Sequence, residues 1–252
     1  MVGRPPLSDS PPTPTRLRAA VSYAVRGDLR FLSHHDELRM FRRALIRAEW
    51  PLRYSEGFNP IPRLTLPLPR SVGMASECQW ALVELSEWRS APALHDRLAH
   101  ALPATCPLGR VCLPVTSMAP HPVRAAYAVE LEAADAAYAR QRIGPLLAAG
   151  ELPVRRSTTE NRPERTIDVR PFVETLVLDG TTVSMRLRFA EQQTARPSEI
   201  LLALGLAPEP YLHRVRRQQV EWDIELVESG GPATQPERIE LAKQEERQRQ
   251  DD

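Results

Sequence analysis

The chain has 252 residues, of which 42% are apolar and 26% charged, and its formal net charge is +1. These values predict a folded, soluble protein with one large domain or two small ones that share a core. No stretch approaches the roughly 20 apolar residues of a membrane span, and residues 1–15 contain no hydrophobic signal segment. We therefore expect a cytoplasmic protein without a membrane partner.

The three cysteines, Cys78, Cys106 and Cys112, lack the C-x-x-C spacing of zinc ribbons and the three-cysteine motif of iron–sulfur enzymes. We therefore expect ordinary reduced thiols, no bound metal and no cofactor held by this chain.

Lys243 is the only lysine among the 33 basic residues, so the positive charge is almost entirely arginine. Residues 228–252 carry an acidic excess, whereas the body of the chain is mildly basic. This balance permits local phosphate-binding patches without indicating a dedicated nucleic-acid protein.

Apolar periodicity in the first half predicts the order strand, helix, strand, strand, helix, strand. Ser33 is a good helix N-cap with Asp36 at the third helical position, and the apolar face of that helix continues to the break at Pro51. The predicted elements are strands at residues 18–25, 64–68, 79–86 and 109–115, and helices that begin after Ser33 and after Ser90.

The second half repeats this order with one strand added. Asp179-Gly180 is a strong hairpin signal between two long strands, and Gly205 follows the last helix. The predicted elements are strands at 127–132, 154–158, 166–178, 181–189 and 213–226, a helix capped by Asp135 and a helix beginning at Pro197.

This order predicts an α+β fold of two tandem ferredoxin-like (split βαβ) halves with antiparallel sheets, at residues 16–120 and 121–227. The Pro-rich residues 1–15 and the charged tail 228–252 cannot bury enough apolar surface to fold, so we expect both termini to be disordered.

The most distinctive segment is the loop that runs from Tyr54 to Arg63. Its glycine and prolines predict a rigid, non-repetitive conformation, and its aromatic and polar groups are those that stack on or hydrogen-bond to a ligand. The alternative is a connecting loop that packs its aromatics under the first helix, with Asn59 holding the loop and Arg63 paired with Asp36 or Glu77. The candidate ligand-binding residues of this loop are Tyr54, Ser55, Gly57, Phe58, Asn59, Pro60 and Arg63.

The helix that follows Ser33 carries further candidates. His34 lies at its N-terminus, where free N–H groups favour an anion. Arg39 and Arg43 form a stripe opposite the apolar face, which is either a solvated surface or a phosphate-binding one. Further arginines follow on predicted strands and could converge with this stripe on one surface: Arg186, Arg188, Arg214, Arg216 and Arg217.

The segment from Phe31 to Glu77 resembles the start of the radical-SAM-linked bacterial protein family, with the pattern F-L-S-H-x-D, then Y-S-x-G-F-N-P-x-P-R and G-x-x-S-E. Two later segments resemble family motifs: Ile167-Asp168-Val169-Arg170 its I-D-x-R, and Arg196-Pro197-Ser198-Glu199 its R-P-x-E. His35 stands where an apolar residue is expected, and Ile61 where many members carry histidine. The resemblance adds Arg170 and Arg196 to the candidate ligand-binding residues.

The resemblance implies a protein encoded beside or fused to a radical SAM enzyme, which would use an iron–sulfur cluster and S-adenosylmethionine. The leading hypothesis is an accessory or substrate-recognition protein for RNA or ribosome modification, with the radical SAM protein and RNA or a ribosomal component as partners. A second hypothesis is a stand-alone, metal-independent RNA-processing or transferase enzyme that uses His34 with Tyr54 or Arg63. A third is a structural adaptor.

Overall fold

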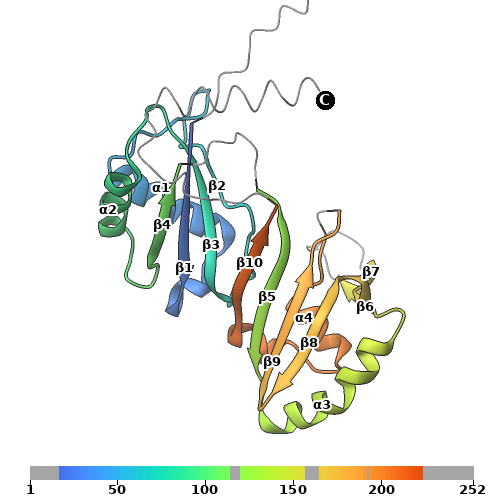
Figure 1. Ribbon diagram of the computed structural model, residues 1–252. Coiled ribbons are helices and arrows are strands. Elements are labelled where there is room, and N and C mark those ends of the chain that lie inside the picture. The colour runs from blue at the N-terminus through green and yellow to red at the C-terminus, as the bar shows by residue number, and fades with distance from the viewer. Residues whose placement is uncertain (1–16, 114–119, 157–164, 192, 224–252) are drawn as a thin grey trace, which may run out of the picture.

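The computed structural model describes residues 17–113, 120–156, 165–191 and 193–223. The predictions for residues 1–15 and 228–252 lie outside these ranges, as do the ends of the predicted strands at 114–115, 157–158 and 224–226. Within the described residues the chain is an α+β protein built on one large, mostly antiparallel sheet (Figure 1).

The first half begins with a strand and a helix that both form where the sequence predicts. Ser33 caps α1, since its Oγ accepts a hydrogen bond from the Asp36 amide at 3.2 Å. Pro67 and Pro69 cannot donate to a strand ladder, so β2 has only two residues instead of five. The elements are β1 (Arg18–Val25), η1 (Gly27–Phe31), α1 (His34–Arg47), β2 (Leu64–Thr65), β3 (Ala75–Glu84), α2 (Ala91–Ala101) and β4 (Leu108–Cys112).

The second half departs from the sequence prediction at several places. The strand predicted at 127–132 begins five residues earlier, at Pro122. Asp135 lies inside α3, and Glu132 is at its N-cap position. The strand predicted at 166–178 is two strands, because a 3₁₀ turn that contains Pro171 interrupts it. The elements are β5 (Pro122–Glu130), α3 (Ala133–Ala148), β6 (Pro153–Arg156), β7 (Arg165–Asp168), η2 (Arg170–Phe172), β8 (Val173–Asp179), β9 (Thr182–Arg188), α4 (Pro197–Ala203), η3 (Glu209–Arg214) and β10 (Val215–Trp222).

The last strand also departs from the prediction, since it begins at Val215 rather than at His213. Two prolines, Pro208 and Pro210, start the 3₁₀ helix η3, and its last turn contains His213. Proline fixes φ near the helical value and lacks the N–H that a strand ladder needs, so the chain turns before it extends.

The strands of the main sheet follow the order β4-β1-β3-β10-β5-β9-β8, and β2 also pairs with β3. β6 and β7 form a separate two-stranded sheet. The two halves of the chain meet where β10 pairs in parallel with β3, through Arg216–Ala75 and Arg217–Ser76. The buried Arg217 reinforces this junction by donating to the carbonyl oxygens of Leu68 and Pro69 at 3.1 and 3.0 Å.

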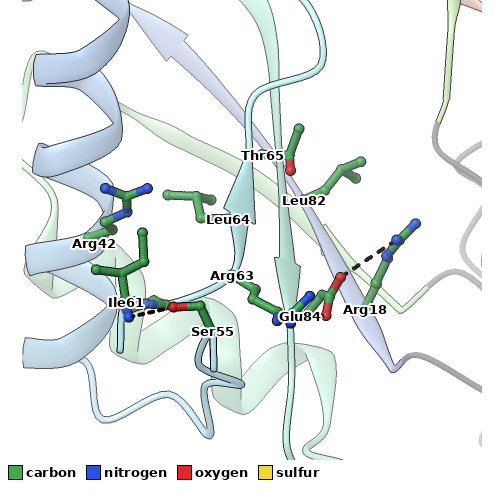
Figure 2. A pocket seen from close by; sticks show the side chains of 10 residues that line it. Arg18, Arg42, Ser55, Ile61, Arg63, Leu64, Thr65, Leu82 and Glu84 are labelled. Atoms are coloured by element: carbon green, nitrogen blue, oxygen red, sulfur yellow. Dashed lines mark hydrogen bonds and ion pairs between the residues drawn. The ribbon is translucent and has the colours of Figure 1, made fainter. Parts of the chain in front are cut away.

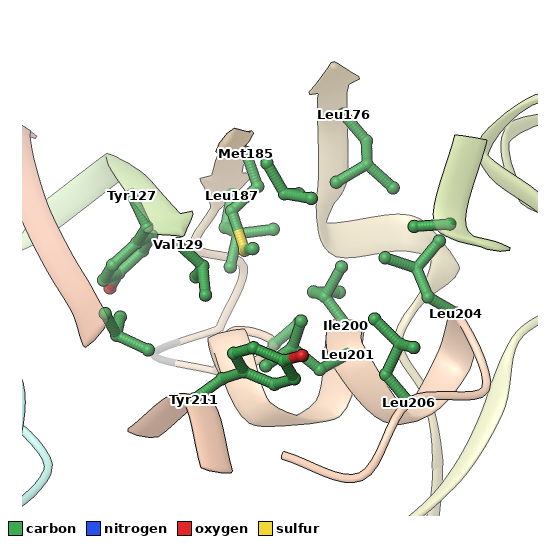
Figure 3. Close-up of a cluster of buried hydrophobic side chains, with 14 of the residues drawn as sticks. Tyr127, Val129, Leu176, Met185, Leu187, Ile200, Leu201, Leu204, Leu206 and Tyr211 are labelled. Carbon is green, nitrogen blue, oxygen red and sulfur yellow. The ribbon is translucent and has the colours of Figure 1, made fainter. Parts of the chain in front are cut away.

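Each half of the sheet has its own hydrophobic core. In the first half, alternate residues of β1 and β3 pack with Phe41 and Leu45 of α1 and with Leu98 of α2. In the second half, residues of β5, β8 and β9 pack against Ile200 and Leu201 of α4, as Figure 3 shows. Within the first half, Arg18 of β1, Arg42 of α1 and Leu64 of β2 line one pocket, where the candidate site lies.

Candidate functional site

The loop between α1 and β2 is a short hairpin. The Ser55 amide donates to the Ile61 carbonyl at 2.9 Å, and the Ile61 amide donates back to Ser55 Oγ at 3.1 Å. Tyr54 and Pro62 form a bridge between the two arms. These contacts close the base of the hairpin and leave residues 56–60 as its tip.

The tip projects into solvent. The Phe58 side chain is 107% exposed relative to the reference value, so it packs on nothing in the described chain. Gly57 has φ of +121°, a backbone conformation that residues other than glycine rarely adopt. The Asn59 side chain makes no hydrogen bond to the described residues. The expectation of a loop that packs its aromatics under α1 is therefore wrong for Phe58, and Tyr54 is 44% exposed.

The base of the hairpin forms one wall of a pocket of about 380 Å³ (Figure 2). Three arginines reach it from separate elements: Arg18 begins β1, Arg42 lies on α1, and Arg63 immediately precedes β2. Glu84, the last residue of β3, is the carboxylate in its lining. The apolar part of the lining includes Ile61, Leu64 and Leu82.

Glu84 lies between two of these arginines. Arg18 is its cross-strand partner and places a guanidinium nitrogen 3.7 Å from the Glu84 carboxylate. Arg63 Nε is 3.9 Å from the same carboxylate and donates to the Tyr54 carbonyl at 3.4 Å. Arg63 therefore pairs with Glu84, whereas Asp36 contacts Arg39 and Glu77 contacts Arg26.

Arg42 contributes a different feature to the pocket. Its Nε is shielded from solvent and has no hydrogen-bond partner among the described residues. A buried donor without a partner costs free energy, so an incoming acceptor at this position is favoured. Three guanidinium groups and one carboxylate therefore line the pocket.

Arg39 and Arg43 lie on another side of α1. They line a second cavity of about 430 Å³, together with Leu29, Leu32 and Met40. The two candidate arginines of this helix therefore lie apart from the hairpin pocket, and their neighbour Arg42 lines it, because the packing of α1 decides which side of the helix faces the hairpin. His34 is half-buried and lines neither cavity.

The family resemblance added Arg170 and Arg196 to the candidates, and neither residue lines either cavity. Arg170 donates to the carbonyl oxygens of Ala149, Val173 and Leu147 at 3.1, 3.1 and 2.8 Å. Its guanidinium therefore ties the end of α3 to β8. Arg196 is exposed at the start of α4, where its amide donates to Glu199.

The arginines on the β-sheet face of the second half are largely neutralised. Arg124 lies 2.8 Å from Glu174 and 3.2 Å from Glu221, and Arg186 pairs with the same two carboxylates. Arg188 donates to the Pro171 carbonyl. These groups do not line the hairpin pocket, so the clusters that the sequence suggested do not converge on it.

A buried polar cluster fixes α1 to the sheet. The Tyr23 hydroxyl donates to Glu37 at 2.8 Å, and Arg70 Nε lies 3.1 Å from the other oxygen of the same carboxylate. Burial, followed by the charge of Glu37, raises the pKa of Tyr23 well above its usual value and that of Cys106 to about 12. This cluster is sealed in the core and positions the helix that carries Arg42.

Two kinds of feature are absent from the described residues. The ranges 17–113, 120–156, 165–191 and 193–223 contain no cluster of three or more histidine, cysteine or acidic side chains with the geometry to hold a metal. No helix in the same ranges is long and apolar enough to cross a membrane.

The fold and the pocket together define an α+β protein with an arginine-rich cavity beside an exposed aromatic hairpin. Residues 18–197 match the family described as "Uncharacterized protein conserved in bacteria (DUF2344)". Because the match covers well over half of the chain, the protein belongs to this bacterial family. The matched range includes the hairpin and every residue that lines its pocket. No curated protein matches the chain.

Proposed function

We propose that the protein is a substrate-recognition module that binds single-stranded RNA through the hairpin and its pocket. The main observation behind this proposal is that the fully exposed Phe58 lies at the tip of the hairpin, while the base of the hairpin forms one wall of a pocket lined by three arginines. An aromatic side chain stacks on an unpaired base, and guanidinium groups bind phosphate oxygens in bidentate fashion.

The rigidity of the hairpin supports this role. The reciprocal Ser55–Ile61 hydrogen bonds hold the two arms together, so Phe58 can be presented at little entropic cost. Tyr54 and Ile61 of the same hairpin are also exposed, at 44% and 47%, so Phe58 belongs to a group of exposed apolar side chains. Such groups mark interaction sites, whereas single exposed apolar side chains do not. A simple connecting loop needs neither feature.

We further propose that the main sheet consists of two ferredoxin-like halves joined edge to edge. In the first half, β4, β1, β3 and β2 follow one another across the sheet, and in the second half β10, β5, β9 and β8 do. With their intervening helices, both orders correspond to the fourth, first, third and second strands of a split βαβ unit. Several RNA-binding modules use related sheets, which supports the proposal by analogy only.

The recognition role extends to a partner enzyme. The sequence resemblance in residues 31–77 supports pairing with a separate radical SAM protein, to which this chain would present RNA or a ribosomal component. The partner would supply the iron–sulfur cluster and S-adenosylmethionine. The enzyme hypothesis uses His34 with Tyr54 or Arg63. Because His34 lines neither cavity and Arg63 pairs with Glu84, a recognition role is favoured over a stand-alone enzyme.

The test is binding of a fluorescent single-stranded RNA by the full chain, measured by anisotropy over a range of salt concentrations. Contacts to about three phosphates predict a slope of log K against log salt near −2. Arg63→Gln and Phe58→Ala should each weaken binding by about 1–3 kcal/mol. The melting temperature should be unchanged in Phe58→Ala and slightly lower in Arg63→Gln, because the latter loses the contacts with Glu84 and the Tyr54 carbonyl.

Arg97→Gln is the matched control, because Arg97 is an exposed arginine of α2 that does not line the pocket. Its affinity should equal that of the unmodified protein. Absence of RNA binding at low salt would contradict the proposal and favour a structural adaptor, and turnover of RNA without any partner would favour the enzyme hypothesis.

A further inference from the structure

We infer that the acidic segment of residues 224–228, which directly follows the last described residue of β10, binds in the hairpin pocket of the same molecule and competes there with RNA. This inference rests on the proposed function and adds a regulation of the same site. Its three supports are the point at which the described chain ends, the direction in which the chain leaves the sheet, and the chemistry of the segment.

The chain leaves β10 beside the pocket. Trp222, the last residue of β10, packs against a small apolar cluster made of Ala20, Trp80, Leu82 and Cys112. Leu82 of this cluster also lines the hairpin pocket. Asp223 is held in place, because its amide donates to the His121 carbonyl at 3.0 Å and its carboxylate accepts from the His121 amide at 2.7 Å. The residues after Asp223 therefore start from a fixed point near the pocket.

The direction of β10 carries the chain toward the end of the sheet where the pocket lies. β10 pairs in parallel with β3, and β3 ends at Glu84, which lines the pocket. Both strands therefore run toward the same end of the sheet. At about 3.4 Å per residue, Glu225 lies at most about 7 Å from Asp223, and Glu228 at most about 17 Å. The two carboxylates of the segment thus have a short tether to the pocket.

The chemistry of the segment complements the lining of the pocket. Its sequence is Ile-Glu-Leu-Val-Glu, and the chain has no basic residue between Arg217 and Arg238. The pocket lining combines arginines with apolar side chains. A carboxylate accepts bidentate hydrogen bonds from a guanidinium group, as a phosphate does. A glutamate of the segment can therefore supply an acceptor to Arg42 Nε, which is shielded from solvent and has no partner among the described residues.

Covalent attachment makes even a weak contact effective. A ligand on a short tether is present at an effective concentration of about 1 mM. A segment that binds the pocket with a Kd of about 0.25 mM then weakens the apparent affinity for RNA about fivefold. RNA has to displace the segment before it can occupy the pocket.

The first experiment measures the binding of fluorescent single-stranded RNA to variants of the full chain at about 0.1 M salt, where charges more than about 10 Å apart are largely screened. Glu225→Gln/Glu228→Gln should bind RNA about fivefold more tightly than the unmodified chain. Glu225→Asp/Glu228→Asp keeps both charges and should bind RNA as the unmodified chain does. Asp251→Asn/Asp252→Asn is the matched control, because it removes two negative charges at the end of the chain, and its affinity should be unchanged.

The second experiment measures docking without RNA. A fluorescein-labelled peptide of residues 224–231 should bind the Glu225→Gln/Glu228→Gln chain with a Kd below about 1 mM, and single-stranded RNA should displace it. Adding Arg42→Gln to that chain should weaken peptide binding, and Arg63→Gln serves as a second pocket variant if the first fails to fold. Arg43→Gln is the control, because Arg43 is the next residue of α1 and lines the second cavity instead.

The outcomes separate this inference from the proposed function. Unchanged RNA affinity in Glu225→Gln/Glu228→Gln contradicts the inference and leaves RNA recognition intact, and equal tightening in Asp251→Asn/Asp252→Asn replaces docking by general charge repulsion. Peptide binding by a chain that does not bind RNA supports the docking and contradicts the proposed function, whereas absence of both contradicts both. Peptide binding that depends on Arg43 rather than Arg42 places the segment on the second cavity and overturns the inference.

Discussion

Replacing Arg70 by methionine tests whether the buried cluster beneath α1 anchors that helix. The Arg70 side chain is 1% exposed, and its Nε lies 3.1 Å from the Glu37 carboxylate. Its terminal nitrogens donate to backbone carbonyls of the η1 turn and of the chain before β3. These acceptors are Leu29, Arg30, Leu32 and Met74.

The magnitude follows from what the substitution leaves behind. Methionine fills the volume but leaves the Glu37 carboxylate, itself 4% exposed, with the Tyr23 hydroxyl as its one side-chain partner among the described residues. Removing one member of a buried ion pair typically costs about 3–5 kcal/mol, because the remaining charge is uncompensated. For a domain stable by about 5–15 kcal/mol this is a large fraction of the total.

The assay is urea unfolding followed by circular dichroism. With an m-value of about 2 kcal/mol/M, Arg70→Met should lower the midpoint by about 2 M. The double variant Glu37→Gln/Arg70→Met removes both charges and should be more stable than the sum of the two single effects predicts. Arg26→Met, which breaks the exposed pair with Glu77, is the control and should leave the midpoint unchanged.

Two results would refute this reasoning. A loss below about 1 kcal/mol in Arg70→Met would mean that the carboxylate of Glu37 finds solvent or another partner. Strict additivity in the double variant would mean that the two side chains act independently and that the pair does not couple α1 to the η1 turn.

Three further predictions concern stability and reactivity. Burial raises the folded-state pKa of Cys106 to about 12 and that of Tyr23 well above its usual value, so the unfolded chain releases these protons at lower pH than the folded one. The free energy of unfolding should therefore fall as the pH rises above about 9. A urea midpoint that is constant from pH 7.5 to 10 would contradict this. For the same reason iodoacetamide at pH 8 should spare Cys106 in the folded protein and label it in urea, as peptide mass spectrometry would show. Gly205→Ala should lower the free energy of unfolding by about 1–2 kcal/mol, because Gly205 has φ of +82° and an added Cβ would lie 3.0 Å from the Tyr138 hydroxyl. Gly150→Ala is the control, since its Cβ would meet nothing within 4 Å. Equal melting temperatures of the two variants would contradict the expected backbone strain at Gly205.

The local elements of the fold could be predicted from the sequence, because they depend on neighbouring side chains. The strand at 18–25 and the helix capped by Ser33 are in the structure as expected. The Asp179-Gly180 turn joins β8 to β9. Alternating apolar residues and a capping oxygen act within a few positions of the chain, so their patterns are visible in one dimension.

The loop from Tyr54 to Arg63 could also be recognised from the sequence, because its glycine, prolines and aromatic residues lie within ten positions. Its hairpin conformation and its exposure were not predicted. The sequence does not distinguish a Phe58 that packs under α1 from one that points into solvent. In the structure the Ser55–Ile61 hydrogen bonds close the base of the hairpin, and Phe58 at its tip is exposed.

The partners of the arginines were decided by tertiary structure alone. Arg18 meets Glu84 because β1 and β3 pair in one particular register, and Arg42 rather than Arg39 faces the hairpin because of how α1 packs on the sheet. Arg170 is a candidate for ligand binding in the sequence, but in the structure its guanidinium donates hydrogen bonds to three backbone carbonyls. Composition and local pattern determine which elements form and how many guanidinium groups the chain has. The strand register and the helix packing angle determine which of those groups can contact a ligand, because both depend on residues far apart in the chain.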